Sequence, residues 1–361
     1  MVRLLPRTGT DVSYYLNDPA AELDGVRSGP AGRWLRGDGP LEPDRVEAVL
    51  CTTPRARVTG YDIVVAAPRP LSMLLAIDPD AAPVVVASHQ RAVQMAVGYL
   101  EERAVVVRQR FLGDDVEDPA QWGAIASFTH GVNRQGEPHL HDHVIVGALP
   151  KGERTVLDRR SLQYHLATAD ALYRAVLRDD VGRQTSWTPW QSARGIDHVG
   201  GLDEGYRALW GGHFAERGTK RRWTREEIVR KWESDLRSFT PLATVPVPPR
   251  PRGQINEYAF GRALRGESRL DRPRLLAAWC NAATYGAPAD ELQGSFDRYY
   301  PQLVQCRGFR SRLLSPREAL MVAHVNEYGN RTLTTLGLNQ EAAPERVPQR
   351  HVQEEIGRAH V

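Results

Sequence analysis

The chain has 361 residues, of which 41% are hydrophobic and 25% charged, with a formal net charge of +3, so it can bury a full core in about two domains. No apolar run approaches the ~18 residues of a membrane span and the N-terminus lacks a signal-peptide pattern, so we expect a cytoplasmic protein. The three cysteines are odd in number and far apart, which argues against a disulfide framework and against a cysteine metal site.

The first predicted elements alternate between strands and a helix. Residues 58–66 (VTGYDIVVA) contain many β-branched side chains and precede a pair of prolines, which predicts a strand. Apolar residues then recur with helical spacing over 89–100, which predicts an amphipathic helix of about 15 to 18 residues. Residues 104–111 and 123–130 predict two further strands, separated by the acidic turn GDDVEDP. A short loop, GVNRQGEP, leads from the second of these into another strand, HDHVIVGAL at 141–149.

Histidines mark the ends of the last two strands. Because their connecting loop is short, we expect the strands to pair antiparallel, which brings His130 close to His141 and His143. Side chains at alternate positions of a strand share one face, so the latter two point the same way. Three imidazoles in this arrangement can hold a divalent metal ion and leave positions open for substrate. His139 belongs to the same alternating series, but it follows Pro138 at the loop end and we expect it to lie outside the metal site.

The C-terminal part is predicted to be mainly helical. Residues 161–177 and 220–236 are predicted helices, the second with a basic approach. Residues 240–253 are rich in proline and lack a helical period, so they are the best candidate for a linker. An N-cap serine followed by a proline and a capping-box glutamate starts a further helix at Ser315. From about residue 340 the chain is polar and is predicted to be a frayed tail.

Two known histidine patterns match the run HLHDHVI poorly. Metallo-β-lactamase-like enzymes have His-x-His-x-Asp-His, and the present run is one residue too short for it. Histidine-triad nucleotide hydrolases separate their histidines by hydrophobic residues, and Asp142 breaks that pattern in a chain far larger than those proteins. A nucleotide hydrolase stays as an alternative, which predicts turnover of small nucleotides without metal.

A third pattern matches in several places. The run FTHGVNRQGEPHLHDHVIV resembles the metal-binding motif of the F-class (MobF) conjugative relaxases, members of the HUH endonuclease superfamily, in which a histidine is followed eleven residues later by a His-x-His pair. GYDIVVAAPRPLS at 60–72 resembles a strand of that family, and VSYYLND at 12–18 resembles its N-terminal Ser-Tyr-Tyr. The resemblance covers about residues 8–235, with the motifs in the family's order.

The resemblance implies an enzyme that cuts one strand of DNA at an origin of transfer and initiates the transfer of a plasmid or mobile element. A tyrosine attacks the phosphodiester and leaves a covalent 5′-phosphotyrosine. Tyr14 aligns with the nucleophile and Tyr15 with the second member of the family's pair. Asp62 aligns with an aspartate credited with orienting a ligand histidine and helping to deprotonate the tyrosine. Arg134 matches an arginine that would bind the scissile phosphate.

The metal implied by the resemblance is one divalent ion, Mg²⁺ or Mn²⁺, with Zn²⁺ as another possibility. Its ligands would be His130, His141 and His143. The family's second tyrosine pair is missing, because LNDPAAELDG follows the first pair here. The helicase of the large members is missing as well, so we expect unwinding to come from a separate protein. The expected partners are single-stranded DNA at an origin of transfer, an accessory DNA-binding protein, a separate helicase and a type IV coupling protein.

Basic residues exceed acidic ones in 205–275, which contains 16 Lys and Arg against 8 Asp and Glu. That excess could face an anionic polymer, and a solvated helical surface is an equally good interpretation of the charge alone. Within it, GTKRRWTR combines basic side chains with an indole that can stack on a base. The candidate DNA contacts are Lys220, Arg221, Arg222, Trp223 and Arg225.

The expected fold class is α/β, with a central antiparallel sheet of the HUH type that carries the three histidines, helices on one face and a helical C-terminal region. We divide the chain into a relaxase domain (1–239), a linker (240–254), a helical region (255–339) and a tail (340–361). Two alternatives keep this fold: a rolling-circle replication initiator with the same chemistry, and a non-catalytic DNA-binding protein with a vestigial metal site.

Overall fold

A computed structural model of the chain describes residues 1–7, 15, 32–36, 58, 60–111, 114–122, 125–147, 156–210, 223–249, 253–263 and 271–305. Two compact units divide the chain. The first comprises residues 1–263 and 272–296 and contains the sheets and the candidate site. Of the second unit, the described residues are Asp271 and 297–305.

A five-stranded antiparallel sheet forms the centre of the first unit, with the strand order β1-β3-β7-β6-β2. Its strands are β1 (Val2–Arg7), β2 (Gly32–Arg36), β3 (Gly60–Ala66), β6 (Ile125–Val132) and β7 (Pro138–Gly147). The three strands predicted to carry the histidines and Asp62 are therefore neighbours in the middle of one sheet. The α/β fold class with a central antiparallel sheet is confirmed.

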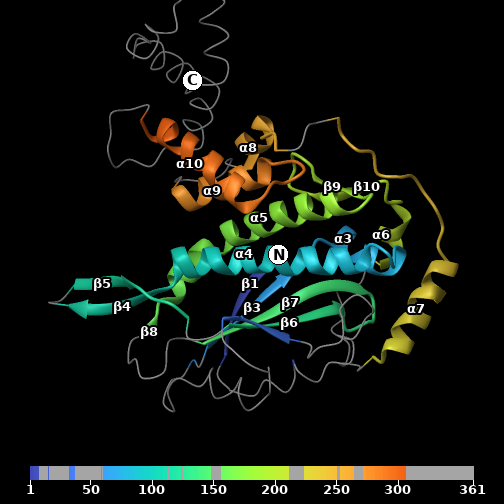
Figure 1. Cartoon of the computed structure of the whole chain (residues 1–361), viewed down its shortest axis with the longest axis horizontal. Helices are drawn as coiled ribbons and strands as arrows, with labels where there is room; N and C mark the ends of the chain where they lie inside the picture. The colour runs from blue at the N-terminus through green and yellow to red at the C-terminus, as the bar shows by residue number, and fades with distance from the viewer. Residues whose placement is uncertain are drawn as a thin grey trace, which may run out of the picture. The chain divides into compact units, whose positions relative to one another are not determined.

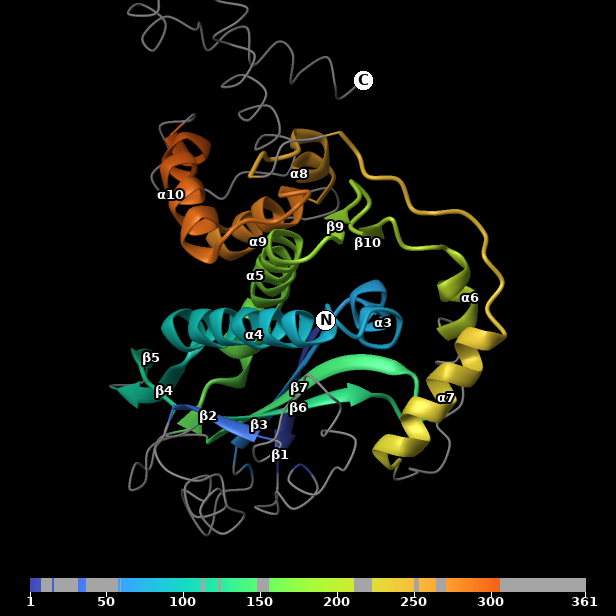
Figure 2. The same ribbon diagram turned by 45° about the vertical axis from the view of Figure 1, so that its right-hand side comes forward.

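Helices cover one face of this sheet, as Figures 1 and 2 show. They are α3 (Arg69–Ile77), α4 (Ala82–Ala104) and α5 (Arg159–Gln184). The apolar face predicted over 89–100 is buried in α4, so that helix is confirmed. It begins earlier than expected because Pro83 lies in its first turn, where a proline loses no helical hydrogen bond. The opposite face of the sheet carries the histidines.

Two smaller sheets lie beside the helices. Strands β4 (Val106–Phe111), β5 (Asp114–Pro119) and β8 (Val156–Leu157) form one, and β9 (Thr188–Gln191) and β10 (Asp197–Gly200) form the other. The prediction of a turn at GDDVEDP is wrong, because residues 114–119 form β5 and pair with β4. The two strands pair antiparallel from Val106 opposite Pro119 to Phe111 opposite Asp114, and this pairing overrides the low strand propensity of aspartate.

Short helices follow the sheets. They are α6 (Gly205–Trp210), α7 (Arg225–Arg237), α8 (Glu257–Ala263), α9 (Arg272–Ala282) and α10 (Ala289–Gln305). Helix α7 confirms the predicted helix from residue 225 onward, while residues 223 and 224 precede it, and its N-cap, Thr224, forms a capping box with Glu227. The helix predicted to start at Ser315 and the tail from 340 lie outside the described residues.

Residues 240–249 have neither helix nor strand, as expected of the proline-rich segment. They are nevertheless bound to the first unit. Val245 is buried, its N–H donates to the carbonyl of Leu202 at 2.8 Å, and its own carbonyl accepts from Gly201 at 2.9 Å. The predicted division of the chain at 240–254 stays a prediction. Within the described ranges, no helix combines the length and apolar character needed to cross a membrane.

Candidate active site

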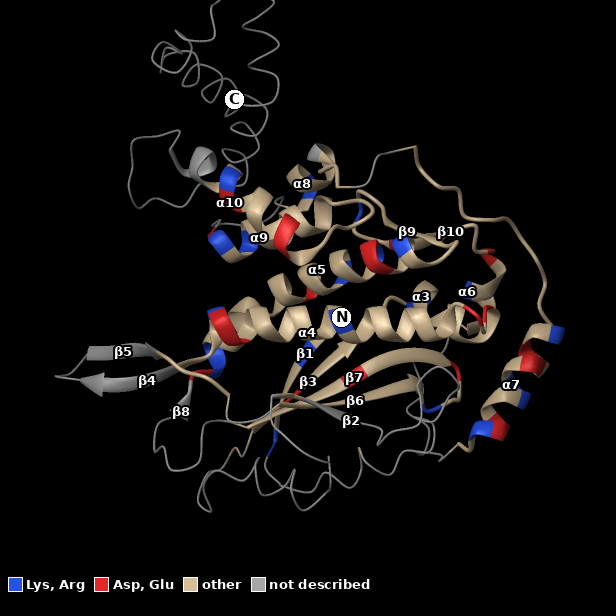
Figure 3. Ribbon diagram, in the orientation of Figure 1, with Lys and Arg blue, Asp and Glu red and all other residues tan. Residues whose placement is uncertain are grey.

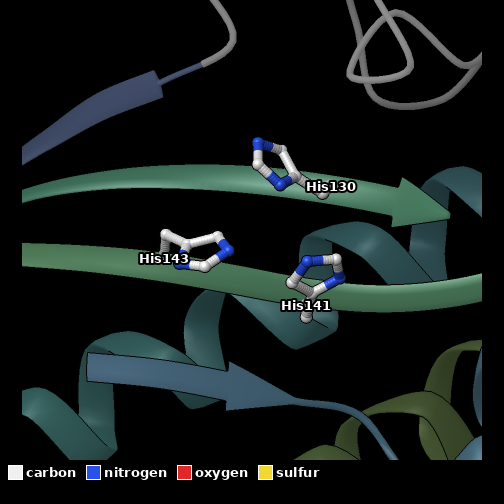
Figure 4. Close-up of side chains that lie close together, drawn as sticks. All are labelled: His130, His141 and His143. Carbon is white, nitrogen blue, oxygen red and sulfur yellow. The ribbon is translucent and has the colours of Figure 1, made fainter. Parts of the chain in front are cut away.

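Three histidines come together on the face of the central sheet opposite α3, α4 and α5 (Figure 4). The β6–β7 register sets His130 opposite His141, which confirms the predicted hairpin. The ring centroids are 5.2 Å apart for His130 and His141, 5.3 Å for His130 and His143, and 5.4 Å for the two histidines of β7. One nitrogen from each ring lies within 4.8 Å of the other two.

The two histidines of β7 are oriented through their Nδ1 atoms. Nδ1 of His143 lies 2.9 Å from Oδ2 of Asp62, and Nδ1 of His141 lies 2.9 Å from the carbonyl oxygen of His139. A carbonyl oxygen only accepts hydrogen bonds, so Nδ1 of His141 carries the proton and its Nε2 keeps a lone pair. A carboxylate or carbonyl that fixes a ring in this way is the usual support of a metal-binding histidine.

The charge state of these rings also suits metal binding. Burial, and after it the neighbouring imidazoles, lowers the pKa of His130 to about 3. Burial and the neighbouring His143 lower the pKa of His141 to about 4. Both rings are therefore neutral at neutral pH, as a ligand must be. Three neutral imidazoles with converging nitrogens fit a divalent ion with an open coordination position.

Tyr15 lies beside the histidines and is bonded to Asp62. Its hydroxyl donates to Oδ2 of Asp62 at 3.0 Å, and its ring centroid is 5.0 Å from that of His143 and 5.4 Å from that of Phe128. Burial, followed by the charge of Asp62, raises the pKa of Tyr15 above its ordinary value. The phenol is therefore protonated at neutral pH and acts as a donor to the carboxylate. Tyr14 lies outside the described residues.

Arg134 occupies the turn between the two histidine-bearing strands. Its side chain is exposed, and in the described part of the molecule it forms no hydrogen bond or ion pair. The turn begins directly after β6, which carries His130. A guanidinium at this place is free to bind a phosphate brought to the histidines.

The N-terminal and central parts of the chain match a known protein family. The family model of the TrwC relaxases matches residues 11–210, which is more than half of the chain. The chain belongs to the TrwC relaxase family. The F-class conjugative relaxase predicted from the motifs is thereby confirmed, and the chain is a DNA relaxase in which three histidines converge on a position that could hold a metal ion.

Solved structures agree on the fold. A copper-bound complex of the conjugative relaxase TrwC with oriT DNA matches at 17% identity with a TM-score of 0.55, and covers 66% of this chain and 98% of that one. A metal-bound complex of TrwC with oriT DNA matches with the same identity and coverage and a TM-score of 0.54. A metal-free complex matches at 19% identity, with a TM-score of 0.52 and the same coverage. At these identities the likeness establishes the fold. No curated protein matches the sequence.

In this relaxase, His139 lies inside β7 and not at the loop end where we expected it. The strand starts at Pro138 because a strand's first residue can lack an N–H. The His139 ring lies 4.8 Å from that of His141, and within the described residues its buried Nδ1 has no hydrogen-bond partner. Burial lowers its pKa to about 2. Its nitrogens do not belong to the group that converges on a metal position.

The candidate DNA contacts of the relaxase are only partly described. Lys220, Arg221 and Arg222 lie outside the described residues. Trp223 donates its indole N–H to the carbonyl of Arg134 at 2.9 Å. Arg225 opens α7, whose four basic residues are balanced by four acidic ones, and Figure 3 shows both signs along this helix. The basic excess of 205–275 therefore does not come from α7.

A buried hydrogen-bond network, which the sequence motifs did not predict, lies beneath the histidines. Asp142 points to the helix-covered face, where its Oδ1 lies 3.0 Å from Nε2 of His89 and its Oδ2 accepts from Ser127 at 2.5 Å. Nδ1 of His89 in turn lies 2.6 Å from the hydroxyl of Tyr173. All four side chains are buried, and they connect β6 and β7 to α4 and α5. Two signals could have revealed it: Asp142 alternates with the metal-binding pair, and His89 belongs to the apolar face of its helix.

Proposed function

We propose that this relaxase nicks one strand of DNA at an origin of transfer through a covalent 5′-phosphotyrosine, and so initiates transfer of a plasmid or mobile element from the cytoplasm. The observation that carries the proposal is a continuous chain of contacts. The hydroxyl of Tyr15 is bonded to Asp62, and Asp62 is bonded to His143 of the three-histidine group. One phenol of the tyrosine pair, a proton acceptor and a proposed metal ligand are thus adjacent, which supports attack of a phenol from this pair on a phosphodiester.

His130, His141 and His143 would hold the ion, for which we propose Mg²⁺ or Mn²⁺, with Zn²⁺ as the alternative. When bound, a divalent ion supplies Lewis-acid polarisation of the phosphate oxygens. The contribution of Asp62 is to hold the His143 ring in one orientation. That of the carbonyl of His139 is to fix the proton of His141 on Nδ1.

The nucleophile is one hydroxyl of the Tyr14–Tyr15 pair. The family resemblance assigns Tyr14, and the hydrogen bond to Asp62 supports Tyr15. In the reaction the phenol proton passes to the carboxylate of Asp62, a bond forms between the phenol oxygen and phosphorus, and the bond from phosphorus to the 3′ oxygen breaks. The 3′ oxygen leaves and takes a proton from water to become a free hydroxyl, Asp62 returns its proton to solvent, and the reverse steps rejoin the strand.

Arg134 is proposed to bind the scissile phosphate through its planar guanidinium, which matches two phosphate oxygens at once. Its exposure, in the turn that follows the strand of His130, supports this role. We also propose that the basic run GTKRRWTR, residues 218–225, contacts the DNA backbone. Single-stranded oriT DNA is the proposed substrate, and a separate helicase, an accessory DNA-binding protein and a type IV coupling protein are the proposed partners.

Covalent capture tests the proposal and requires no assumption about the DNA sequence of the origin. The protein is incubated with Mn²⁺ or Mg²⁺ and a pool of single-stranded oligonucleotides with a randomised core, and adducts that survive denaturing electrophoresis are recovered and sequenced. We expect an adduct that a chelator abolishes and that His141→Ala abolishes as well. Asp62→Asn should slow its formation about 100-fold or more, because a general base contributes on that order.

Tyrosine variants complete the test. Either Tyr14→Phe or Tyr15→Phe should abolish the adduct, whereas Tyr164→Phe, which alters an exposed tyrosine of α5, should leave it unchanged. A protein that binds the pool and forms no adduct with either metal would favour the non-catalytic alternative. A recovered sequence that lies in a replication origin would favour the initiator.

A further inference from the structure

The turn between β6 and β7, residues 133–137, is held from outside by the segment that contains α7. The indole N–H of Trp223, just before the helix, donates to the carbonyl oxygen of Arg134 at 2.9 Å. The indole N–H of Trp232, within the helix, donates to the carbonyl oxygen of Gly136 at 2.8 Å. Two tryptophans from one short segment thus bind two carbonyls of the same turn.

The fit between the turn and Trp223 is close. Gly136 has a φ of +73°, and a Cβ atom built on it would come within 2.9 Å of the indole ring. A side chain at this position would therefore be strained by the backbone conformation and would also collide with the ring. The glycine allows the indole to lie directly on the backbone of the turn.

The inner side of the turn is fixed as well. Oδ1 of Asn133 accepts from the N–H of Gln135 at 2.9 Å and of Glu137 at 3.0 Å. The buried carboxylate of Glu137 accepts from Nδ2 of Asn133 at 2.8 Å and is bonded to the guanidinium of Arg69 in α3. Arg69 also donates to the carbonyl of Trp210 at 2.9 Å. The backbone of the turn is thus held on both sides, while the side chain of Arg134 points to solvent.

Helix α7 also contacts other elements through its buried side chains and through Asp235. Only Ile228 and Trp232 are buried among its residues. Besides the two indole bonds to the turn, Asp235 accepts a hydrogen bond from the indole of Trp210 at 2.9 Å. The family model ends at residue 210, so it assigns no role to this helix. The turn that carries Arg134 is therefore one contact of the segment that contains α7.

We propose that Trp223 and Trp232 are positioning residues that fix the turn, so that the guanidinium of Arg134 meets the scissile DNA phosphate in the geometry needed for cleavage. The proposal rests on the proposed function, in which Arg134 binds that phosphate. A misplacement of about 1 Å can cost about 100-fold in rate, so a backbone that holds Arg134 in place speeds cleavage. Trp223 then acts through the turn, and not by stacking on a DNA base.

We call the two indole hydrogen bonds from Trp223 and Trp232 to the turn the clamp. Hydrogen–deuterium exchange tests this clamp without any DNA. Trp223→Phe and Trp232→Phe each remove one indole donor and keep an aromatic ring. We expect exchange of the amides in 133–137 to rise about fivefold in each variant, the factor that corresponds to the net loss of one hydrogen bond. Unchanged exchange in both variants would overturn the proposal, whether or not the protein cleaves DNA.

Matched controls exist elsewhere in the chain. Trp187 is half-buried, like Trp223, and donates to Asp78 at 2.8 Å, while Trp279 is buried, like Trp232, and donates to Ser295 at 3.0 Å. Trp187→Phe and Trp279→Phe should leave exchange in the turn unchanged. Faster exchange in the turn of these variants would show general loosening and would contradict a specific clamp.

A double-mutant cycle of Trp223→Phe with Arg134→Ala tests whether Trp223 acts by positioning the guanidinium of Arg134. On an oligonucleotide recovered by covalent capture, Trp223→Phe should slow single-turnover cleavage about tenfold in the unsubstituted protein and less than about twofold in the Arg134→Ala background. Equal slowing in both backgrounds would overturn the proposal. If the unsubstituted protein forms no adduct, the proposed function fails on its own. The same cycle is then measured on affinity for the single-stranded pool, where non-additivity supports the clamp and additivity overturns it.

Discussion

Asp62 accepts hydrogen bonds from both Tyr15 and His143, so one carboxylate connects a member of the tyrosine pair to the three-histidine group. Its side chain is buried, and the β3–β7 register places it on the same face as His143. A buried carboxylate that has two donors is held in one position. The residue is therefore suited to accept a proton from a phenol without moving away from the ring it orients.

The four histidines at this site, His130, His139, His141 and His143, are predicted to differ in metal binding. His139→Ala should keep one equivalent of bound Mn²⁺, because its nitrogens do not converge with the others. His130→Ala and His141→Ala should each lose the ion, because each removes one of three ligands. Metal content after gel filtration, measured by mass spectrometry of the metal, checks this. Loss of the ion in His139→Ala would show that this ring is a ligand.

Some residues of the site could be predicted and others could not. His130, His141 and His143 follow from strand alternation and a short hairpin loop, both of which are local properties of the chain. Asp62 and Arg134 came from the family motifs, because no local rule distinguishes them from a strand-edge charge or an exposed arginine. The indole bonds of Trp223 and Trp232 join segments that are about 90 residues apart in the sequence. No spacing pattern reports such a contact.

Elements with a clear hydrophobic period were predicted best. Helix α4 and strands β3, β6 and β7 lie where period and β-branched content placed them. Strand β5 was missed because its acidic composition is typical of a turn, and its pairing with β4 decides its conformation. The start of β7 at Pro138 was missed for a related reason, since the proline suggested that the loop continued.

The packing of α9 on α5 gives a prediction at the scale of elements. Arg178 of α5 is buried, and its Nη2 donates to the carbonyls of Cys280 at 3.4 Å and Ala283 at 3.0 Å, while Nη1 lies 3.1 Å from Asp197. Burial lowers the pKa of this guanidinium to about 10, so it is still charged at neutral pH. A fragment that ends at residue 239 removes both carbonyls and uncovers the apolar side of α5.

We therefore expect fragment 1–239 to be less stable than fragment 1–305. Its Tm should be lower by about 5 °C or more, because a buried charge that loses its acceptors is strongly destabilising. Thermal unfolding followed by circular dichroism compares the two fragments. Equal Tm values would support the predicted boundary at 240–254, and a lower value for the shorter fragment would place α9 within the relaxase domain.

At the scale of the whole molecule, the described face of the central sheet opposite the helices bears the catalytic candidates. The helix-covered face anchors the strands through the buried network of Asp142 and His89. One sheet thus separates a structural side from a reactive side. The proposed metal ligands from β6 and β7 and the carboxylate from β3 reach the same place because these three strands are neighbours.

Mass spectrometry of the covalent adduct tests the central claim most directly. Trypsin should release residues 8–27 as one peptide, and its only tyrosines are Tyr14 and Tyr15. After incubation with metal and the single-stranded DNA pool, followed by nuclease and trypsin, this peptide should carry a nucleotide on one of these two phenols. A nucleotide on any other residue, or no covalent nucleotide in a protein that binds both the metal and the DNA, would contradict the account.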